Sequence, residues 1–217
     1  MSGPHEAQPL LQSGPALGTG EGVLILLHGR GGSAANIMQL GPALLQPLKE
    51  GTSRITCLAP AANGGSWYPQ SFLAPREENE PYLTSALETV ARMLQLALDA
   101  GVPHERIVLG GFSQGACLSS EFVASHPARY GGLIAFTGGL VGPLGSDVRH
   151  NGDLSGMPAL LLSGDPDPHV PWSRVEETAA VLTEMGATVN TRRFPGRPHV
   201  VSSEEIILSG RMLTQIF

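Results

Sequence analysis

The 217-residue chain has few cysteines and no cluster of basic residues, and each scarcity excludes a class of protein. Only Cys57 and Cys117 occur, one in a predicted strand and one in a predicted helix, so we interpret both as buried small side chains rather than as a disulfide framework. Lys and Arg number 13 against 19 Asp and Glu, for a net charge of -6. Without a basic surface to neutralise phosphates, nucleic acid is not expected as a partner.

Long apolar runs are also missing, and none approaches the ~20 residues that a membrane span requires. Residues 1–20 contain Pro, Gly and Ser but no basic start followed by an apolar core, so they do not predict a signal peptide. We expect a flexible lead over residues 1–20 and a single domain over residues 21–217. With only two cysteines, the chain fits a reducing, cytoplasmic setting without stable membrane insertion.

Short apolar runs alternate with helical patterns along the rest of the chain. Strands are expected over residues 23–27, 54–59, 107–112, 133–136, 159–162 and 188–194. Helices are expected over residues 36–48, 85–98, 113–126, 173–185 and from 202 onward. In three places a serine is followed three residues later by a glutamate, as in a capping box: Ser85–Glu88, Ser173–Glu176 and Ser202–Glu205. Residues 141–157 are expected to be mostly loop. This alternation predicts an α/β fold with a doubly wound, mostly parallel sheet and helices on both faces, whose ligands bind beyond the carboxyl ends of the strands.

The sequence Gly111-Phe112-Ser113-Gln114-Gly115 lies between a buried strand and a helix. This is the context of a nucleophile elbow, in which a sharp turn presents the serine hydroxyl at the end of the sheet. Glycines at the outer positions allow strand and helix to approach closely. The five-residue pattern is weak on its own, since on the order of 0.3 matches arise by chance at these residue frequencies, so its context carries the interpretation.

A serine nucleophile needs a histidine base and an acid that orients it. His199 follows the last predicted strand, which agrees with the order Ser, acid, His of α/β-hydrolases, although His169 also follows a strand. The acid is Asp165 or Asp167, and we favour Asp167 because Asp165 can brace the turn. The remaining histidines have structural or solvent-facing interpretations: His5 in the lead, His28 as buried loop support, and His104, His126 and His150 at helix ends or in a polar loop.

Two backbone N–H groups are candidates for an oxyanion hole, which stabilises negative charge on a carbonyl oxygen during attack. One belongs to Gln114, directly after the serine. The other belongs to Arg30, in the glycine-rich loop after the first buried strand, where Gly31 and Gly32 leave the backbone free to orient its amides. A simple tight turn is the alternative interpretation of this loop.

Taken together, several motifs resemble the phospholipase/carboxylesterase family of α/β-hydrolases, which includes the acyl-protein thioesterases. They are Leu27-His28-Gly29, Ser66-Trp67-Tyr68, Gly110 to Gly115, Gly164 to Pro171, and His199. The resemblance runs from about residue 23 to the end of the chain. It implies a single-domain α/β-hydrolase with a short or absent lid, a triad of Ser113, Asp167 and His199, and hydrolysis of carboxylic esters or thioesters without a metal or organic cofactor. Family members can form dimers, which leaves a homodimer open.

Two departures from the family's thioesterases bear on the substrate. Arg30 stands where those enzymes usually carry Leu, and the connection between Pro60 and Ser66 is short where they have an insertion that helps to cover the acyl chain. The chain therefore looks like a microbial esterase acting on small or medium acyl esters; acyl-protein thioesterase or lysophospholipase activity and a non-catalytic binding protein are the alternatives. Trp67 and Tyr68 either line the substrate pocket or form a structural pair, and the charges of Arg30 and Arg197 either bind an anionic group or are solvated.

Overall fold

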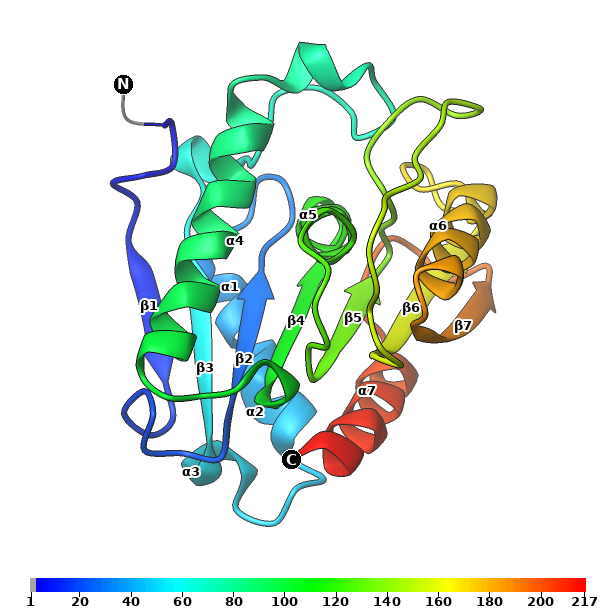
Figure 1. Ribbon diagram of the computed structural model, residues 1–217. Helices are drawn as coiled ribbons and strands as arrows, with labels where there is room; N and C mark the ends of the chain where they lie inside the picture. The colour runs from blue at the N-terminus through cyan, green and yellow to red at the C-terminus, as the bar shows by residue number, and fades with distance from the viewer. Residues whose placement is uncertain (1–2) are drawn as a thin grey trace.

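A single twisted sheet organises the computed structural model, which describes residues 3–217. Its strand order is β1-β3-β2-β4-β5-β6-β7, and every neighbouring pair is parallel except β1 with β3 (Figure 1). The strands are β1 Leu10–Ser13, β2 Gly22–Leu27, β3 Ile55–Pro60, β4 Ile107–Phe112, β5 Gly132–Phe136, β6 Pro158–Asp165 and β7 Thr188–Pro195. The predicted doubly wound, mostly parallel α/β fold is confirmed.

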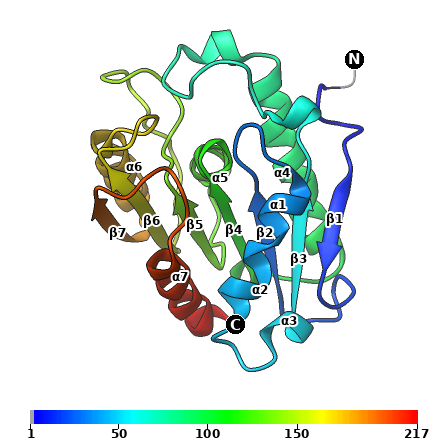
Figure 2. The same ribbon diagram turned by 180° about the vertical axis from the view of Figure 1, so that it is seen from behind.

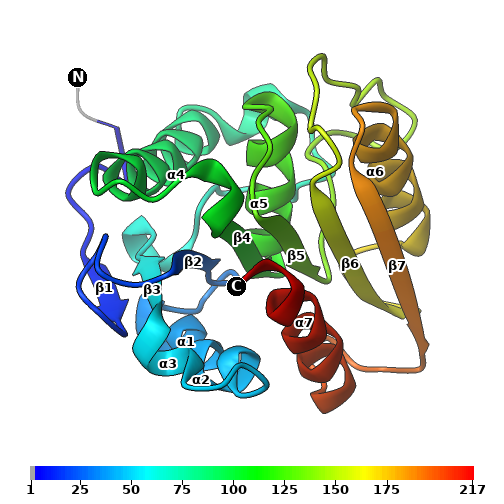
Figure 3. The same ribbon diagram turned by 60° about the horizontal axis from the view of Figure 1, so that its bottom comes forward.

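Helices cover both faces of the sheet. They are α1 Ala34–Met38, α2 Leu40–Leu45, α3 Gly51–Arg54, α4 Tyr82–Asp99, α5 Gln114–Ser125, α6 Trp172–Glu184 and α7 Ser203–Ile216, with short 3-10 turns at Asn63–Gly65, Arg76–Asn79 and His104–Arg106. Figures 2 and 3 show α4, α5 and α6 on one face and α1, α2 and α7 on the other. None of these helices within residues 3–217 is long and apolar enough to cross a membrane.

The strand β2 shows why the sheet needs cover on both sides. Its alternate side chains Val23 and Ile25 join the core beneath α4 and α5, whereas Leu24 and Leu26 join the core beneath α2 and α7. All four are fully buried. A continuous apolar run is therefore required, because consecutive side chains of a strand point to opposite faces.

The helix predicted over residues 36–48 is instead two short helices, α1 and α2, that meet at Gln39. Pro42 explains the break, because its ring removes the N–H that a continuous helix would donate to the carbonyl of Met38. Proline is tolerated in a first helical turn, and Pro42 lies in the first turn of α2. A single residue, Pro42, thus sets the position of the break between α1 and α2.

Only one of the three predicted capping boxes forms. The Ser202 side chain accepts a hydrogen bond from the backbone N–H of Glu205, and the Glu205 carboxylate accepts one from the N–H of Ser202. Ser85 and Ser173 lie inside α4 and α6, which begin earlier, directly after Pro81 and Pro171. Those two predictions are wrong because Pro81 and Pro171 occupy the N-cap positions, so both serines already lie within the helix.

The segment before Gly20 differs from the flexible lead that the sequence suggested. Met1 and Ser2 lie outside the described residues, but Leu10–Ser13 form β1, which pairs antiparallel with β3 from Leu10 opposite Pro60 to Ser13 opposite Cys57. The strand has only four residues with mostly exposed side chains. Such an edge strand carries no apolar pattern, so its backbone pairing leaves no signal in the sequence.

Candidate active site

Ser113 lies at the sharp turn between β4 and α5, with a strained backbone of φ 55° and ψ -119°. The glycines on either side permit this turn. A Cβ at Gly111 would overlap the backbone of Gly115, and a Cβ at Gly115 would overlap the carbonyl of Leu27 in the neighbouring strand. The turn therefore holds the serine at the carboxyl edge of the sheet, in the conformation of a nucleophile elbow.

Three side chains from three strand ends form a hydrogen-bonded chain here. Nε2 of His199 lies 2.9 Å from the hydroxyl oxygen of Ser113, and Nδ1 of the same ring lies 2.8 Å from Oδ2 of Asp167. Asp167 follows β6 and His199 follows β7, so residues 86 and 32 positions apart in the chain meet at one point. The side chain of Asp167 is fully buried and that of His199 is 18% exposed. This order of groups can carry a proton from the serine to the imidazole.

The surroundings of Asp167 keep its carboxylate ionised. Burial alone would raise its pKa, but hydrogen bonds from His199 and from the backbone N–H groups of His169 and Val170 outweigh burial and lower the pKa below its ordinary value. Asp165, the alternative acid, instead forms an ion pair with Arg193. An ionised Asp167 can fix the tautomer and orientation of the imidazole.

The rival histidine, His169, lies beside the hydrogen-bonded chain without joining it. Its ring centroid is 4.9 Å from that of His199, with the two rings at 78°. Phe112 packs against the same imidazole, at a centroid distance of 5.0 Å. Both residues line the cleft, so His199 is confined between two rings while its nitrogens contact Ser113 and Asp167.

The loop that carries His199 is tied down by Arg197, which the sequence left as a solvated charge or an anion site. Arg197 is only 9% exposed. Its guanidinium donates to the hydroxyl of Thr137 at 2.6 Å and to the carbonyls of Pro198 and Val200, and it lies 3.4 Å from the buried carboxylate of Glu205. Solvated charge is therefore wrong for this residue, and its donors point into the protein rather than into the cleft.

The two candidate oxyanion donors lie on either side of the elbow. The Gln114 N–H is the first of α5 and has no partner within the helix, as in any helix N-terminus. The Arg30 N–H lies in the loop after β2, whose shape is held by hydrogen bonds from Gly31 to Gly65 and from Gly32 to Gly29. Within residues 3–217 neither N–H of the pair donates to another group, so both are available to a substrate oxygen.

The side chain of Gln114 has a role that the sequence analysis missed. Its Oε1 accepts a hydrogen bond from the backbone N–H of Trp67 at 2.8 Å, and its Nε2 donates to the carbonyl of Tyr68 at 2.8 Å. The amide of this buried residue thereby fixes the loop that forms one wall of the cleft. The two ends of the amide accept and donate at the same time, which suits a backbone N–H and a carbonyl that lie side by side.

The sequence left Trp67 and Tyr68 open between pocket and structural roles, and the structure separates them. Trp67 is fully buried, donates from Nε1 to the carbonyl of His28 at 2.8 Å, and does not line the cleft. Tyr68 does line it, although its hydroxyl is buried and has no hydrogen-bond partner in the part of the chain that the structure describes. Tyr68 is therefore the member of the pair that borders the substrate space.

Two buried histidines support the same wall. The ring of His28 donates from Nδ1 to the carbonyl of Gly29 and accepts at Nε2 from the N–H of Ala62. His5, from the N-terminal segment, bonds to the carbonyl of Trp67 at 2.9 Å and accepts from the N–H of Asn63 at 3.0 Å. Burial lowers the pKa of both rings, which keeps them neutral and structural. His28 thus has the supporting position expected of it, whereas His5 lies in the folded protein.

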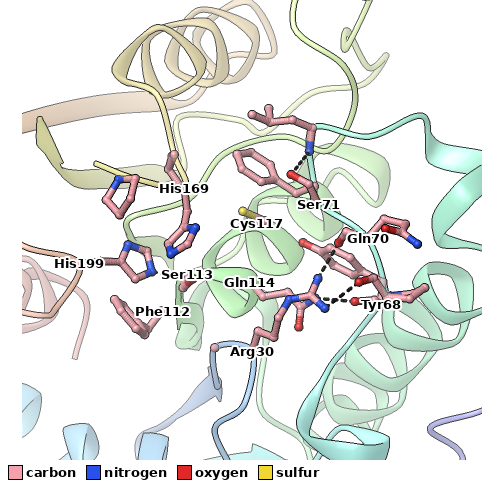
Figure 4. Close-up of a pocket in the computed structure, with 16 residues that line it drawn as sticks. Arg30, Tyr68, Gln70, Ser71, Phe112, Ser113, Gln114, Cys117, His169 and His199 are labelled. Atoms are coloured by element: carbon pink, nitrogen blue, oxygen red, sulfur yellow. Dashed lines mark hydrogen bonds between the residues drawn. The ribbon is translucent and has the colours of Figure 1, made fainter. Parts of the chain in front are cut away.

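A cleft of about 630 Å³ opens above Ser113 (Figure 4). It is lined by Gly29, Arg30, Tyr68, Pro69, Gln70, Ser71, Phe72, Leu73, Phe112, Ser113, Gln114, Cys117, Pro168, His169, Val170 and His199. Cys117 lies at its floor, and burial raises the pKa of its thiol to about 12, so it stays protonated and does not compete with Ser113 as a nucleophile.

Two loops are joined by one buried carboxylate, that of Glu121 in α5, and of the two only the loop between β3 and α4 contributes residues to the cleft. Arg76, from the loop between β3 and α4, donates to Glu121 at 2.5 Å. From the loop after β5, the backbone N–H of Val141 donates to it at 3.1 Å and Nε2 of His150 lies 3.4 Å away. Burial works to raise the pKa of Glu121, but His150 and Arg76 outweigh it and lower that pKa. A charged Glu121 therefore connects both loops to the helix that begins at the elbow.

Comparison with known proteins matches residues 18–209 to a family described as phospholipase/carboxylesterase. A crystal structure of a phospholipase/carboxylesterase from Dyadobacter fermentans is 40% identical, covers 95% of this chain and 97% of its own, and superposes with a TM-score of 0.89. The acyl-protein thioesterase 1 homolog 1 of Dictyostelium discoideum is 29% identical over 91% of both chains. The acyl-protein thioesterase 1 of Gibberella zeae is 31% identical over 52% of this chain, a match that spans about half (49%) of that relative.

Proposed function

This chain belongs to the phospholipase/carboxylesterase family of α/β-hydrolases, and on that premise we propose that it is a serine hydrolase that cleaves carboxylic esters through an acyl-enzyme. One observation carries the proposal. The imidazole of His199 is within hydrogen-bond distance of the Ser113 hydroxyl on one side, 2.9 Å, and of the Asp167 carboxylate on the other, 2.8 Å. These are the distances that a nucleophile, its base and an orienting acid require.

In the first half of the reaction, Oγ of Ser113 attacks the ester carbonyl while its proton passes to Nε2 of His199. Asp167 stabilises the imidazolium that forms, and the N–H groups of Arg30 and Gln114 donate to the oxyanion. The tetrahedral intermediate then collapses, the bond from carbon to the alcohol oxygen breaks, and His199 returns its proton to the leaving alcohol. In the second half a water molecule, deprotonated by His199, attacks the acyl-enzyme and releases the acid with Ser113 regenerated.

Small or medium acyl groups are the proposed substrates. The connection between Pro60 and Ser66 is short and contains the turn Asn63–Gly65. The N–H of Asn63 donates to His5, so this turn is held against the N-terminal segment rather than extended over the cleft. Phe72 and Leu73, in the loop between β3 and α4, are apolar residues that line the cleft. Acyl-protein thioesterase or lysophospholipase activity is the second candidate, because two of the relatives are named acyl-protein thioesterases. Activity profiles over acyl lengths from two to sixteen carbons distinguish the two, and a clear preference for long chains would favour the second.

Replacement of Ser113 by alanine tests the mechanism. We expect Ser113→Ala to lose about 10³-fold or more of its kcat on 4-nitrophenyl butyrate, as removal of a nucleophile does in other serine hydrolases. The exposed Ser53→Ala, in α3 far from the cleft, is the matched control. A fluorophosphonate probe should label the wild-type protein and not Ser113→Ala. Wild-type turnover in Ser113→Ala rejects the mechanism, and absence of both turnover and labelling in the wild type supports a non-catalytic binding protein.

A further inference from the structure

The side chain of Arg30 is a positive charge at the cleft that no carboxylate neutralises. Its Nη1 donates to the carbonyl of Pro69 at 2.8 Å and its Nη2 to that of Gln70 at 2.5 Å. Arg30 takes part in none of the ion pairs formed between residues 3 and 217. Among the residues that the structure describes, no Asp or Glu lines the cleft. The substrate space therefore contains one permanent cation and no formal anion.

The guanidinium keeps most of its binding capacity. It has five N–H donors, of which the two loop carbonyls take two, and its charge persists at every physiological pH. The planar fork of an arginine fits a carboxylate with two parallel hydrogen bonds. The carbonyls of Pro69 and Gln70 already hold the side chain in one position. Binding of a carboxylate therefore costs little side-chain conformational entropy.

The position of Arg30 relative to Ser113 indicates which half of an ester it meets. Figure 4 shows His199 on one side of Ser113 and the guanidinium of Arg30 on the other. His199 has to return its proton to the leaving alcohol, so the alcohol half of the ester lies on the His199 side. The carbonyl oxygen meets the N–H groups of Arg30 and Gln114. The acyl half, the remaining substituent of the carbonyl carbon, then occupies the rest of the cleft, which is lined by the Arg30 side chain with Tyr68 and Gln70.

We infer that Arg30 selects esters whose acyl half carries a free carboxylate, that is, monoesters of short dicarboxylic acids. This inference rests on the proposed ester hydrolysis and names its substrate class. The net charge of -6 opposes anions at long range, but salt at physiological strength screens charges beyond about 8 Å. Within the cleft the nearby guanidinium therefore determines the sign of the electrostatic interaction with an anionic substrate. A brace for the loop of Pro69 and Gln70 is the competing role, and it would affect neutral and anionic substrates alike.

Three esters distinguish these two roles of Arg30. Their hydrolysis is measured at pH 7.5 from the protons that the released acid gives up. Monoethyl glutarate carries the carboxylate on the acyl half, ethyl pentanoate is its neutral match, and 3-(butanoyloxy)propanoate carries the carboxylate on the alcohol half. We expect the ratio of kcat/KM for monoethyl glutarate over ethyl pentanoate to fall about tenfold in Arg30→Met and to be partly kept in Arg30→Lys. Arg211→Met, which removes an exposed cation on α7, should leave this ratio unchanged.

The ratio is used because Arg30→Met can also disturb the loop and the backbone N–H, and such losses cancel between the two substrates. An unchanged ratio in Arg30→Met overturns the inference. A ratio that changes for 3-(butanoyloxy)propanoate instead of monoethyl glutarate overturns the assignment to the acyl half. Raising the KCl concentration should also reduce the wild-type preference for the anionic ester.

A binding measurement keeps this test independent of catalysis. Glutarate should bind to Ser113→Ala, detected by calorimetry or by chemical-shift changes, with a Kd that rises about tenfold when Arg30→Met is added. An equal Kd in both proteins rejects the anion site. If Ser113→Ala retains turnover while glutarate binding still depends on Arg30, the proposed mechanism fails and the anion site stands.

Discussion

The guanidinium of Arg197 donates to the hydroxyl of Thr137 across 2.6 Å, joining the His199 loop to the end of β5 although the two residues are 60 positions apart. Thr137 is fully buried and holds a left-handed backbone at φ 57°. The same nitrogen, Nη2, lies 3.4 Å from the carboxylate of Glu205, in the first turn of α7. The loop that aims the imidazole is thus anchored to two separate elements by one side chain.

Thr137→Ala should therefore lower kcat while leaving KM nearly unchanged, because the imidazole loses a support without any loss of substrate contact. We expect about a tenfold decrease, below the roughly 100-fold that a 1 Å misplacement can produce. Thr137→Ser, which keeps the hydroxyl, is the matched control and should restore kcat. Steady-state kinetics on 4-nitrophenyl butyrate provide the measurement, and a wild-type kcat in Thr137→Ala would contradict the anchoring role.

Gly115→Ala should destabilise the fold severely. The added Cβ overlaps the carbonyl of Leu27, a backbone group that cannot move without disturbing the sheet. We expect a loss of about 3 kcal/mol or more in the free energy of unfolding. Gly64→Ala is the matched control, because φ is 61° there but nothing lies within 4 Å, so about 1 kcal/mol of strain is expected. Urea denaturation measures both, and similar losses would count against the close-approach interpretation.

Gln114→Leu should loosen the wall of the cleft. It leaves the N–H of Trp67 and the carbonyl of Tyr68 buried without their partner, at a cost of about 1–3 kcal/mol for each group. We expect a lower urea midpoint and faster proteolysis within the loop of residues 63–71. Gln95→Leu, in an exposed pair with Asp99 on α4, should change neither. Wild-type stability of Gln114→Leu would show that the loop is held by other contacts.

Stability should fall as the pH drops below the ordinary histidine pKa of 6.5. The folded-state pKa values of His5 and His28 are lowered by burial, so the unfolded chain binds protons first as the pH falls. Their contribution is complete above pH 6.5 and is lost progressively toward the lower folded pKa. Thermal melts between pH 7.5 and 5.0 should thus show a decreasing Tm, in a window above the carboxylate titrations of Asp167 and Glu121.

His5→Phe should reduce this pH dependence and also lower the Tm at pH 7.5. It leaves the carbonyl of Trp67 and the N–H of Asn63 without their partner, for a loss of about 2–10 °C in a chain of this size. His104→Gln leaves both buried imidazoles in place and should keep the wild-type slope. An unchanged slope in His5→Phe would exclude His5 as a source of the pH dependence.

The parallel core of the fold was predictable from sequence because its signals are local. The run from Val23 to Leu27 is apolar throughout, with Gly22 before it and His28-Gly29 after it, and β2 occupies Gly22–Leu27. The capping box at Ser202 was likewise read correctly, since side chain and helix start lie within four residues. By contrast, β1 forms through backbone pairing with β3, which lies more than forty residues away in the chain. Leu10, for example, pairs with Pro60. Long-range pairing by exposed residues leaves no trace in composition.

The candidate site divides in the same way. Chain order and strand ends indicate Ser113, His199 rather than His169, and Asp165 or Asp167, of which Asp167 is favoured. The structure brings Ser113, Asp167 and His199 together. The surroundings were not predictable, because a buried polar side chain looks like a surface one in sequence. Arg197 is such a case: its charge suggests solvent, and only its burial beside Glu205 identifies it as an anchor. Likewise, Trp67 and Tyr68 are neighbours whose separate roles depend on the direction of each ring.

The buried carboxylate of Glu121 has a consequence for redesign of the cleft. Arg76 belongs to the loop that lines the cleft with Phe72 and Leu73, whereas Val141 and His150 belong to a second loop that does not line it. Because both loops contact Glu121, a substitution that shifts either loop changes the electrostatic environment of both. Effects of mutations that share such a partner are not additive. The second loop also donates from the N–H of Gly142 to the carbonyl of the cleft residue Phe72. Libraries for acyl specificity should therefore vary residues 72–79 and 141–150 together, although only the first loop lines the cleft.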